Sequence, residues 1–189
     1  MRRRHFLEIF GTTSVSVISG CIGKSESKKP AFVSSSPAFE SGDTLPSQFT
    51  CEGTGKSPPF IVNRIPEPTK SLAITGEWSK GPINEPRFWT IWNIPPETER
   101  IPVGIPRTKR VESLGGARQG RQRGGTVGYK PPCPPSGQSY EHRFQIYALD
   151  QMLDAPAGTT NEEASEAIGS SELASNRITL TYTRSTADG

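Results

Sequence analysis

The stretch that most constrains the fold of this chain is Lys130–Asp150, KPPCPPSGQSYEHRFQIYALD. Four prolines stiffen its first half, and Gly137 ends the stiff loop. From Arg143 to Leu149 apolar and polar residues alternate, which predicts a half-buried β-strand. A rigid loop that leads into such a strand is typical of a ligand-facing site, because proline removes conformational entropy that binding would otherwise cost.

The first residues of the chain have the pattern of a targeting segment. Arg3-Arg4 begins a twin-arginine pattern, and Ile18-Ser19-Gly20-Cys21 resembles a lipobox in which Cys21 is lipidated. The apolar run between them is too short and too polar for a spanning helix. Residues 1–21 are therefore expected to be a twin-arginine lipoprotein signal peptide, which would leave the domain extracytoplasmic and anchored to the outer face of the cell membrane. The alternative is a disordered start with an incidental cysteine.

The rest of the chain divides into a tether and one domain. Residues 22–37 are rich in Lys and Ser and predict a flexible tether. Residues 38–185 are enough for a single domain with a sizeable core. Residues 1–20 carry a net charge of +2 out of the chain's +3. The weakly charged remainder lacks the concentrated basic surface of nucleic-acid-binding proteins, so we expect no nucleic-acid partner.

If Cys21 is lipidated, Cys51 and Cys133 are left as a pair outside the cytoplasm. Oxidising compartments favour a disulfide, and a bridge across this long segment is worth about 4 kcal/mol in the chain-entropy model. Two free buried thiols are the alternative. A metal site is not expected, because the three cysteines and two histidines show no ligand spacing.

Hydrophobic patterning predicts many strands and one helix. The helix is expected to begin at Thr160–Glu163, where an N-cap residue precedes acidic residues, and to reach about Ser175. Glu97–Lys130 has no sustained period and is expected to be a long loop. The expected strands lie within Phe39–Thr50, Phe60–Val62, Ser71–Thr75, Phe88–Ile94, Arg143–Leu149 and Arg177–Thr183. This pattern predicts a mainly-β domain.

Several motifs follow one another in an order that can be compared with known families. They are Ser57-Pro58-Pro59, Ser71–Thr75, Trp89–Pro95, Gly128-Tyr129, Pro132–Pro135 with Gly137, His142–Phe144 and Tyr147–Asp150. In this order they resemble the phosphatidylethanolamine-binding proteins, in particular the bacterial and archaeal branch often called Raf kinase inhibitor-like proteins. The resemblance covers about residues 38–185. It implies an antiparallel β-sandwich with a few peripheral helices, and members with cysteines at these places commonly look disulfide-bridged, which agrees with pairing Cys51 and Cys133.

The resemblance also implies a small pocket for phosphate, acetate or a phospholipid head group. His142 and Pro135 match the family's pocket histidine and proline. Phe144 stands where tyrosine is usual, Phe88 where a second histidine is usual, and Trp78 where an acid is usual. We therefore expect these five residues to bind the ligand in a partly degraded, more apolar pocket.

His142 is a candidate ligand group on physical grounds as well. A histidine beside a rigid loop can donate a hydrogen bond to an anion, and it is expected to titrate near neutrality. The alternative is a histidine that is exposed or simply ends the loop.

No catalytic motif is visible in the sequence. It lacks a G-x-S-x-G elbow, a P-loop and a dinucleotide-binding fingerprint, so we expect a binding protein with no cofactor rather than an enzyme. One hypothesis is an anchored protein that holds a small anion or head group. The other is a protein-interaction module that inhibits a protease or regulates a kinase-like partner. Arg118, Arg121, Arg123 and Lys130 could contact lipid head groups or belong to a solvated loop.

Overall fold

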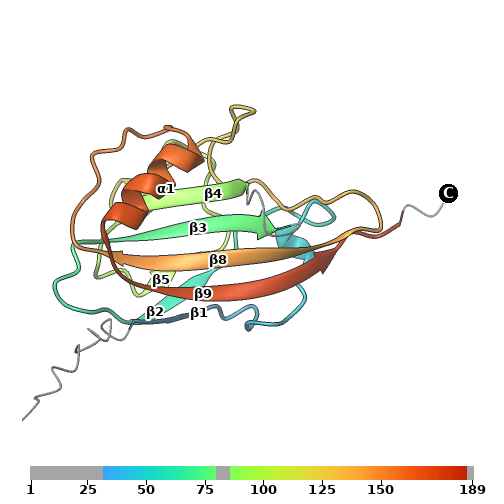
Figure 1. The fold of residues 1–189 in the computed structure, drawn as a ribbon, viewed down its shortest axis with the longest axis horizontal. Helices are drawn as coiled ribbons and strands as arrows, with labels where there is room; N and C mark the ends of the chain where they lie inside the picture. The colour runs from blue at the N-terminus through green and yellow to red at the C-terminus, as the bar shows by residue number, and fades with distance from the viewer. Residues whose placement is uncertain (1–31, 80–85, 187–189) are drawn as a thin grey trace, which may run out of the picture.

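Two antiparallel sheets form the domain over the residues that this computed structural model describes, 32–79 and 86–186 (Figure 1). The strand order is β6-β7-β4-β3-β8-β9 in the larger sheet and β1-β2-β5 in the smaller one. The larger sheet contains β3 (Ser71–Ser79), β4 (Arg87–Ile94), β6 (Arg110–Val111), β7 (Ala117–Gln119), β8 (Ser139–Leu149) and β9 (Glu172–Thr183). The smaller sheet contains β1 (Val33–Ser35), β2 (Phe60–Arg64) and β5 (Arg100–Ile101). The expected mainly-β sandwich is confirmed.

The main core lies between the two sheets. Residues two apart on β8 share one face, and His142, Phe144, Ile146 and Ala148 form its buried row. Phe60 of β2 meets this row, with its ring centroid 5.6 Å from that of Phe144. The predicted alternation of β8 therefore places its apolar face against the smaller sheet.

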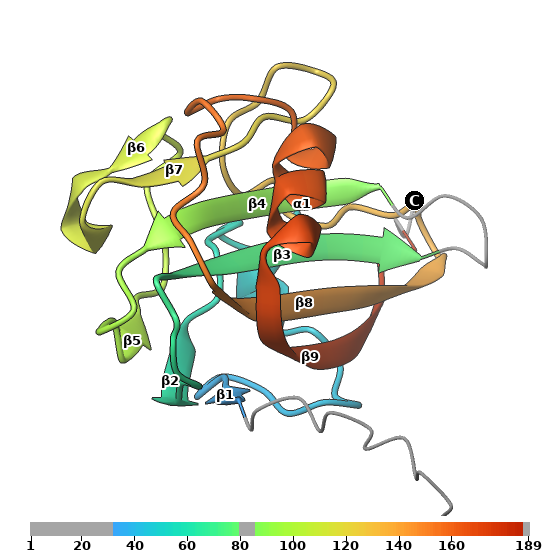
Figure 2. The same cartoon turned by 60° about the vertical axis from the view of Figure 1, so that its left-hand side comes forward.

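Helix α1 (Asn161–Ser170) lies across the outer face of the larger sheet (Figure 2). Its Ala164 and Ile168 join a second apolar cluster with Trp92 and Leu149 from the sheet. The hydroxyl of Thr160 accepts a hydrogen bond from the backbone N–H of Glu163, which confirms the predicted helix start.

The predicted end of this helix is wrong. The helix stops at Ser170 rather than near Ser175, and Leu173 belongs to β9. The backbone of β9 pairs with β8 from Glu172 onward, so sheet pairing outweighs the local helical pattern. Within the described ranges 32–79 and 86–186, no helix has the length and hydropathy needed to cross a membrane.

The N-terminal part of the domain differs from expectation. β1 lies within residues 22–37, the expected tether, and pairs with β2, so the paired chain begins ahead of residue 38. The strand predicted within Phe39–Thr50 is wrong. That segment contains a short 3-10 helix, η1 (Ser47–Phe49), and Phe39, Leu45 and Phe49 turn into the core. Its apolar residues are therefore buried in the core, although the segment does not form a strand.

The chain before η1 covers the outer edge of β9. The N–H of Gly42 donates to the carbonyl of Thr179 over 2.7 Å, and the N–H of Leu45 donates to that of Thr181 over 2.9 Å. The N–H of Thr181 returns a hydrogen bond to the carbonyl of Asp43 over 3.0 Å. This edge of the larger sheet is therefore occupied along part of its length.

The segment Glu97–Lys130, expected to be a long loop, contains short regular elements. They are β5, β6, β7 and a 3-10 helix, η2 (Glu112–Leu114). Strands of two or three residues are too short to show a period, so the sequence pattern could not reveal them. The expected signal peptide and its Cys21 lie outside the described residues.

Candidate functional site

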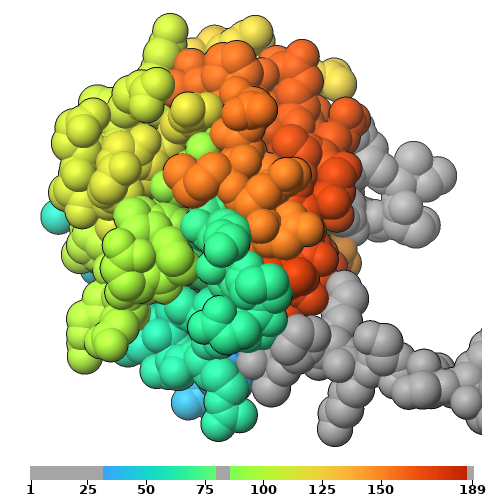
Figure 3. All heavy atoms as spheres, turned by 90° about the vertical axis from the view of Figure 1, so that its left-hand side faces the viewer, coloured from blue at the N-terminus to red at the C-terminus, as the bar shows by residue number. Residues whose placement is uncertain are grey.

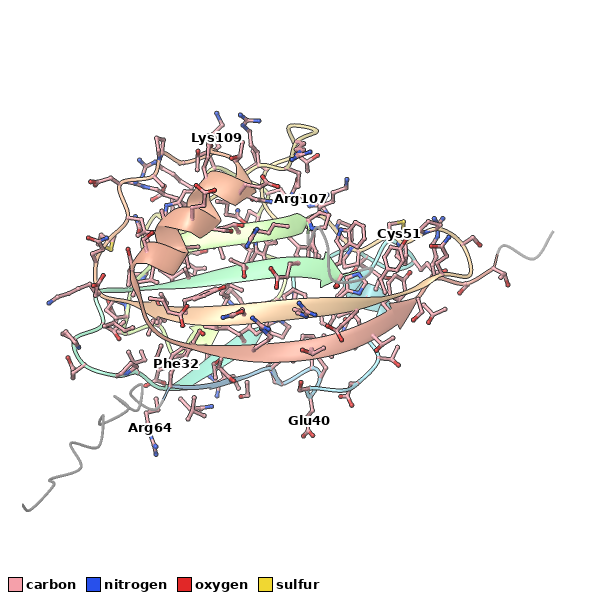
Figure 4. All side chains as sticks on the ribbon, viewed as in Figure 1. Phe32, Glu40, Cys51, Arg64, Arg107 and Lys109 are labelled. Atoms are coloured by element: carbon pink, nitrogen blue, oxygen red, sulfur yellow. A yellow bond between two sulfur atoms is a disulfide. The ribbon has the colours of Figure 1, made fainter. Side chains whose placement is uncertain are left out.

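A cavity of about 990 Å³ opens at the end of the sandwich that carries the disulfide, where Cys51 is labelled in Figure 4. Its walls come from β3, β4, β8, the loop before β8 and the start of α1. Four of the five predicted ligand-binding residues line it, namely Trp78, Phe88, Pro135 and His142. The sequence therefore located the cavity, although not all of its lining.

The proline-rich loop is held in place as one wall of the cavity. Cys51 and Cys133 form the expected disulfide, with an S–S distance of 2.10 Å, and Cys133 lines the cavity. The N–H of Cys51 donates to the carbonyl of Pro132 over 3.0 Å. On the cavity's other side, the N–H of Lys130 donates to the carbonyl of Phe88 over 3.1 Å. The disulfide and the hydrogen bonds therefore attach the loop to the chain just after η1 and to β4.

His142 forms part of the cavity lining, although its side chain is almost completely buried. The residue is only 1% exposed, and Nδ1 lies 3.1 Å from the backbone carbonyl oxygen of Tyr140. Burial lowers the pKa of His142 to about 4, against the opposing effects of the Tyr140 hydrogen bond and the Glu141 charge. The expectation that His142 titrates near neutrality is wrong, because burial disfavours the charged imidazolium.

Phe144 is a core residue rather than part of the cavity lining. It is 0% exposed, and its ring stacks on those of Phe39 and Tyr129 at centroid distances of 6.0 and 6.5 Å. Phe88 lies between it and the cavity, 5.6 Å from Phe144 and 6.0 Å from His142. The predicted ligand contact of Phe144 is therefore not supported, since its position on β8 is one step deeper than His142.

A stacked aromatic pair borders the cavity near the end of β3. The rings of Trp78 and Tyr140 are 4.9 Å apart with an interplanar angle of 6°, and both residues are half-buried. Tyr140 was missed as a lining residue. The signal was available, because Tyr140 precedes His142 by two positions and so shares its face of the strand.

Three cationic side chains line the cavity, and only one of them has an acidic partner among the described residues. Arg87 lies 3.9 Å from the carboxylate of Glu77. Arg123 and Lys130 are exposed and have no ion-pair partner within the part of the chain that the structure describes. Glu162, at the start of α1, is the acidic residue of the lining. The open rim is therefore mainly positive.

The other arginines of the predicted basic group are used differently. Arg118 donates from Nη1 to the carbonyls of Leu153, Asp154 and Ala155 over 3.1, 3.3 and 2.8 Å. Its guanidinium thus holds a loop rather than facing ligand. Arg143, outside that group, donates from Nε to the carboxylate of Glu141 on the same strand over 2.6 Å.

Gln122 is a second buried polar residue of the lining. Its Nε2 donates to the carbonyls of Phe88 and Gly128, both over 2.7 Å, and this fixes the side-chain orientation. Its Oε1 is buried and has no hydrogen-bond partner among the residues that the structure describes. No sequence signal marked Gln122, because its place depends on how the loop folds back onto β4. Over residues 32–79 and 86–186, no three His, Cys, Asp or Glu side chains come together as metal ligands.

Known proteins resemble this chain over the whole sandwich. A model of the phosphatidylethanolamine-binding protein family matches residues 35–183. A UPF0098 protein of Pyrococcus horikoshii is 36% identical over 166 residues, covering 87% of this chain and 82% of that protein. A UPF0098 protein of Archaeoglobus fulgidus is 39% identical over 150 residues, covering 79% of this chain and 50% of that protein.

Two solved structures share the fold. A phosphatidylethanolamine-binding protein homologue from Chlamydia trachomatis matches with a TM-score of 0.69 and 30% identity, covering 82% of this chain and 98% of its own. YbcL of Escherichia coli, whose structure is described as that of a member of the mammalian family, matches with a TM-score of 0.72 and 25% identity. That match covers 80% of this chain and 98% of YbcL.

Proposed function

This chain belongs to the phosphatidylethanolamine-binding protein family, and on that premise we propose that it is a lipid-anchored extracytoplasmic protein that binds a small anion or a phospholipid head group. The observation that carries the proposal is the cavity, which combines a buried histidine with two exposed cations, Arg123 and Lys130. Exposed cations around a concave site attract anions and raise their local concentration.

The residues that line the cavity support binding of a ligand with an apolar part. The anion would lie near Arg123 and Lys130, and the remainder of the ligand would lie against Phe88 and the Trp78–Tyr140 pair. Sites of this kind combine apolar walls with a few polar groups that fix orientation. The rigid proline loop reduces the entropy that is lost when the ligand binds.

We propose binding rather than catalysis. A nucleophile needs a positioned base, and a catalytic histidine is usually oriented by an acid. Here Nδ1 of His142 is occupied by the backbone carbonyl of Tyr140. Within the described part of the chain, the imidazole therefore has no acidic partner of the kind found in a triad.

The proposed location rests on the N-terminal sequence and on the disulfide. The twin-arginine pattern and the lipobox at Cys21 supply an export signal and an anchor. The Cys51–Cys133 bridge suits an oxidising compartment. In cells that carry Cys21→Ser, we expect the protein to leave the membrane fraction; retention there would contradict the anchor.

Calorimetric titration of the 189-residue chain with phosphate, acetate and glycerophosphoethanolamine tests the binding proposal. We expect saturable binding that weakens about tenfold or more in an Arg123→Ala/Lys130→Ala variant, since charged hydrogen bonds contribute about 1.5 kcal/mol or more each. Lys109→Ala is the matched control, because Lys109 is also exposed but lines a separate hollow with Arg118. Absence of saturable binding to all three probes would overturn the proposal and favour a protein partner.

A further inference from the structure

Nε2 of His142, the ring nitrogen that is left to contact a ligand, is a hydrogen-bond acceptor rather than a donor. A backbone carbonyl only accepts hydrogen bonds, so the contact of 3.1 Å between Nδ1 and the Tyr140 oxygen requires the proton to be on Nδ1. In the neutral ring Nε2 then carries a lone pair. Among the described residues, Nε2 has no hydrogen-bond partner.

The surroundings of His142 keep the ring neutral. Phe88 and Tyr182 flank it at centroid distances of 6.0 Å each. The hydroxyl of Tyr182 donates to Glu52 over 2.6 Å, so this acid is already engaged. The ionisable groups that surround the ring on the adjoining elements are Arg87, Arg123, Lys130, Arg184, Glu52, Glu77, Glu141, Glu162, Arg143, Tyr140 and Tyr182.

Burial, and not the charges around the ring, disfavours an imidazolium. The charge of Glu141 acts in the opposite direction and is outweighed by burial. Glu141 and Glu77 are both paired with Arg143, at 2.6 and 4.0 Å. The Nε2 lone pair is therefore available to a donor.

Gln122 adds a second acceptor to the same wall. It is 8% exposed, and its unpartnered Oε1 is held in place because Nε2 donates to the carbonyl of Phe88. A buried acceptor without a donor is unfavourable. Oε1 of Gln122 is such an acceptor, and it belongs to the same cavity lining as His142, so the lining offers acceptors to a ligand that carries a hydrogen-bond donor.

We propose, resting on the function proposed above, that the cavity selects phosphate and phosphomonoesters that carry a P–O–H group over fully ionised oxyanions such as sulfate. The P–O–H group donates to Nε2 of His142, and the ionised oxygens face Arg123 and Lys130. Sulfate has the same shape but no proton near neutral pH, so it places an acceptor against an acceptor. A phosphodiester has no P–O–H group near neutral pH, so it satisfies the requirement only through an amine or a hydroxyl elsewhere in the molecule.

Titrations at pH 6 and pH 8 on the 189-residue chain test this selection. The probes are inorganic phosphate, methyl phosphate, dimethyl phosphate, glycerophosphoethanolamine and sulfate. A phosphomonoester has a second pKa of about 6, so its protonated fraction falls about 50-fold from pH 6 to pH 8, and its affinity is expected to fall equally. At pH 6 sulfate and dimethyl phosphate are expected to bind at least about tenfold more weakly than methyl phosphate. Glycerophosphoethanolamine, if it binds as methyl phosphate does, identifies a head group as the source of the donor.

Two further measurements make the test independent of any single variant. At pH 8, binding of methyl phosphate is expected to take up one proton, seen as a heat that changes between buffers of different ionisation enthalpy. The ¹⁵N shifts of His142 report whether Nε2 is unprotonated in the free protein; His5→Gln removes the chain's other imidazole and is the matched control.

The variant His142→Phe keeps a ring but removes the acceptor. Its preference for phosphate over sulfate is expected to disappear.

The outcomes separate this inference from the function on which it rests. Equal affinity for phosphate and sulfate at both pH values, or a proton on Nε2 of the free protein at pH 7, overturns the selection and leaves the anion site intact. Absence of saturable binding of every probe at both pH values overturns the proposed function and the selection with it.

Discussion

The two ends of β8 are stabilised by different kinds of interaction. At one end Ile146 and Ala148 are 0% exposed and have apolar neighbours from both sheets. The surface there is formed by the loop between β2 and β3 and the loop between β8 and α1, which lie side by side in Figure 3. At the other end His142 borders the cavity, whose outer wall is a proline-rich loop carrying a disulfide.

This difference shows how a cavity is kept open at the end of a packed sandwich. The closed end is stabilised by removing apolar side chains from water. At the cavity end a space is left between the strands and the proline-rich loop. Covalent and backbone bonds to the loop, through Cys133 and Pro132, stabilise this end instead.

Removal of the disulfide tests this contrast and has the largest expected effect. The bridge closes a separation of 82 residues, so Cys51→Ser/Cys133→Ser is expected to lower the free energy of unfolding by about 4 kcal/mol. The same variant is expected to weaken phosphate binding, because Cys133 belongs to the cavity wall. Chemical denaturation and calorimetry measure the two effects.

Ile146→Ala is the control at the closed end. Truncating this buried side chain is expected to lower the free energy of unfolding by about 3 kcal/mol and to leave phosphate affinity unchanged. An equal loss of affinity in both variants would show that the two ends of β8 are not independent.

A smaller effect is expected from the pH dependence of stability at the cavity end. The pKa of His142 is about 4 in the folded protein, below its ordinary value of 6.5, so the unfolded chain binds more protons between these values. Stability is therefore fully present above pH 6.5 and lost as the pH falls toward 4. The contribution of His142 to this loss is expected to be about 2.5 kcal/mol at pH 4.5 relative to pH 7.

Urea denaturation of the wild type and of His142→Phe at both pH values isolates that contribution, since acidic residues affect both proteins alike. The difference in stability between pH 7 and pH 4.5 is expected to be smaller in the variant. The same dependence in both proteins would show that His142 is not held neutral.

The family resemblance predicted His142 and Pro135 as pocket residues, and both line the cavity. Cys133 was predicted only as a disulfide partner, and it lines the cavity as well. Phe144 could not be separated from His142, because both occupy the same face and only the packing of Phe39 and Tyr129 shows where the core begins.

Features that depend on tertiary structure were not predicted. Arg123, Lys130 and Gln122 lie in a region without a period, and they reach the cavity only because the loop folds back over β4. The apolar residues Leu45 and Phe49 suggested a strand, whereas their segment buries them beside β9. In each case the sequence shows that the segment is apolar or basic. Where its side chains lie depends on contacts with distant parts of the chain.

The covered edge of β9 has a consequence for self-association. β9 is 12 residues long, and a strand of that length with free backbone groups at its edge is a template on which another chain can add a strand. Residues 42, 43 and 45 already occupy hydrogen-bonding groups of Thr179 and Thr181 on that edge. Copies of this protein gathered at high local concentration are thereby prevented from joining through this part of the sheet and aggregating.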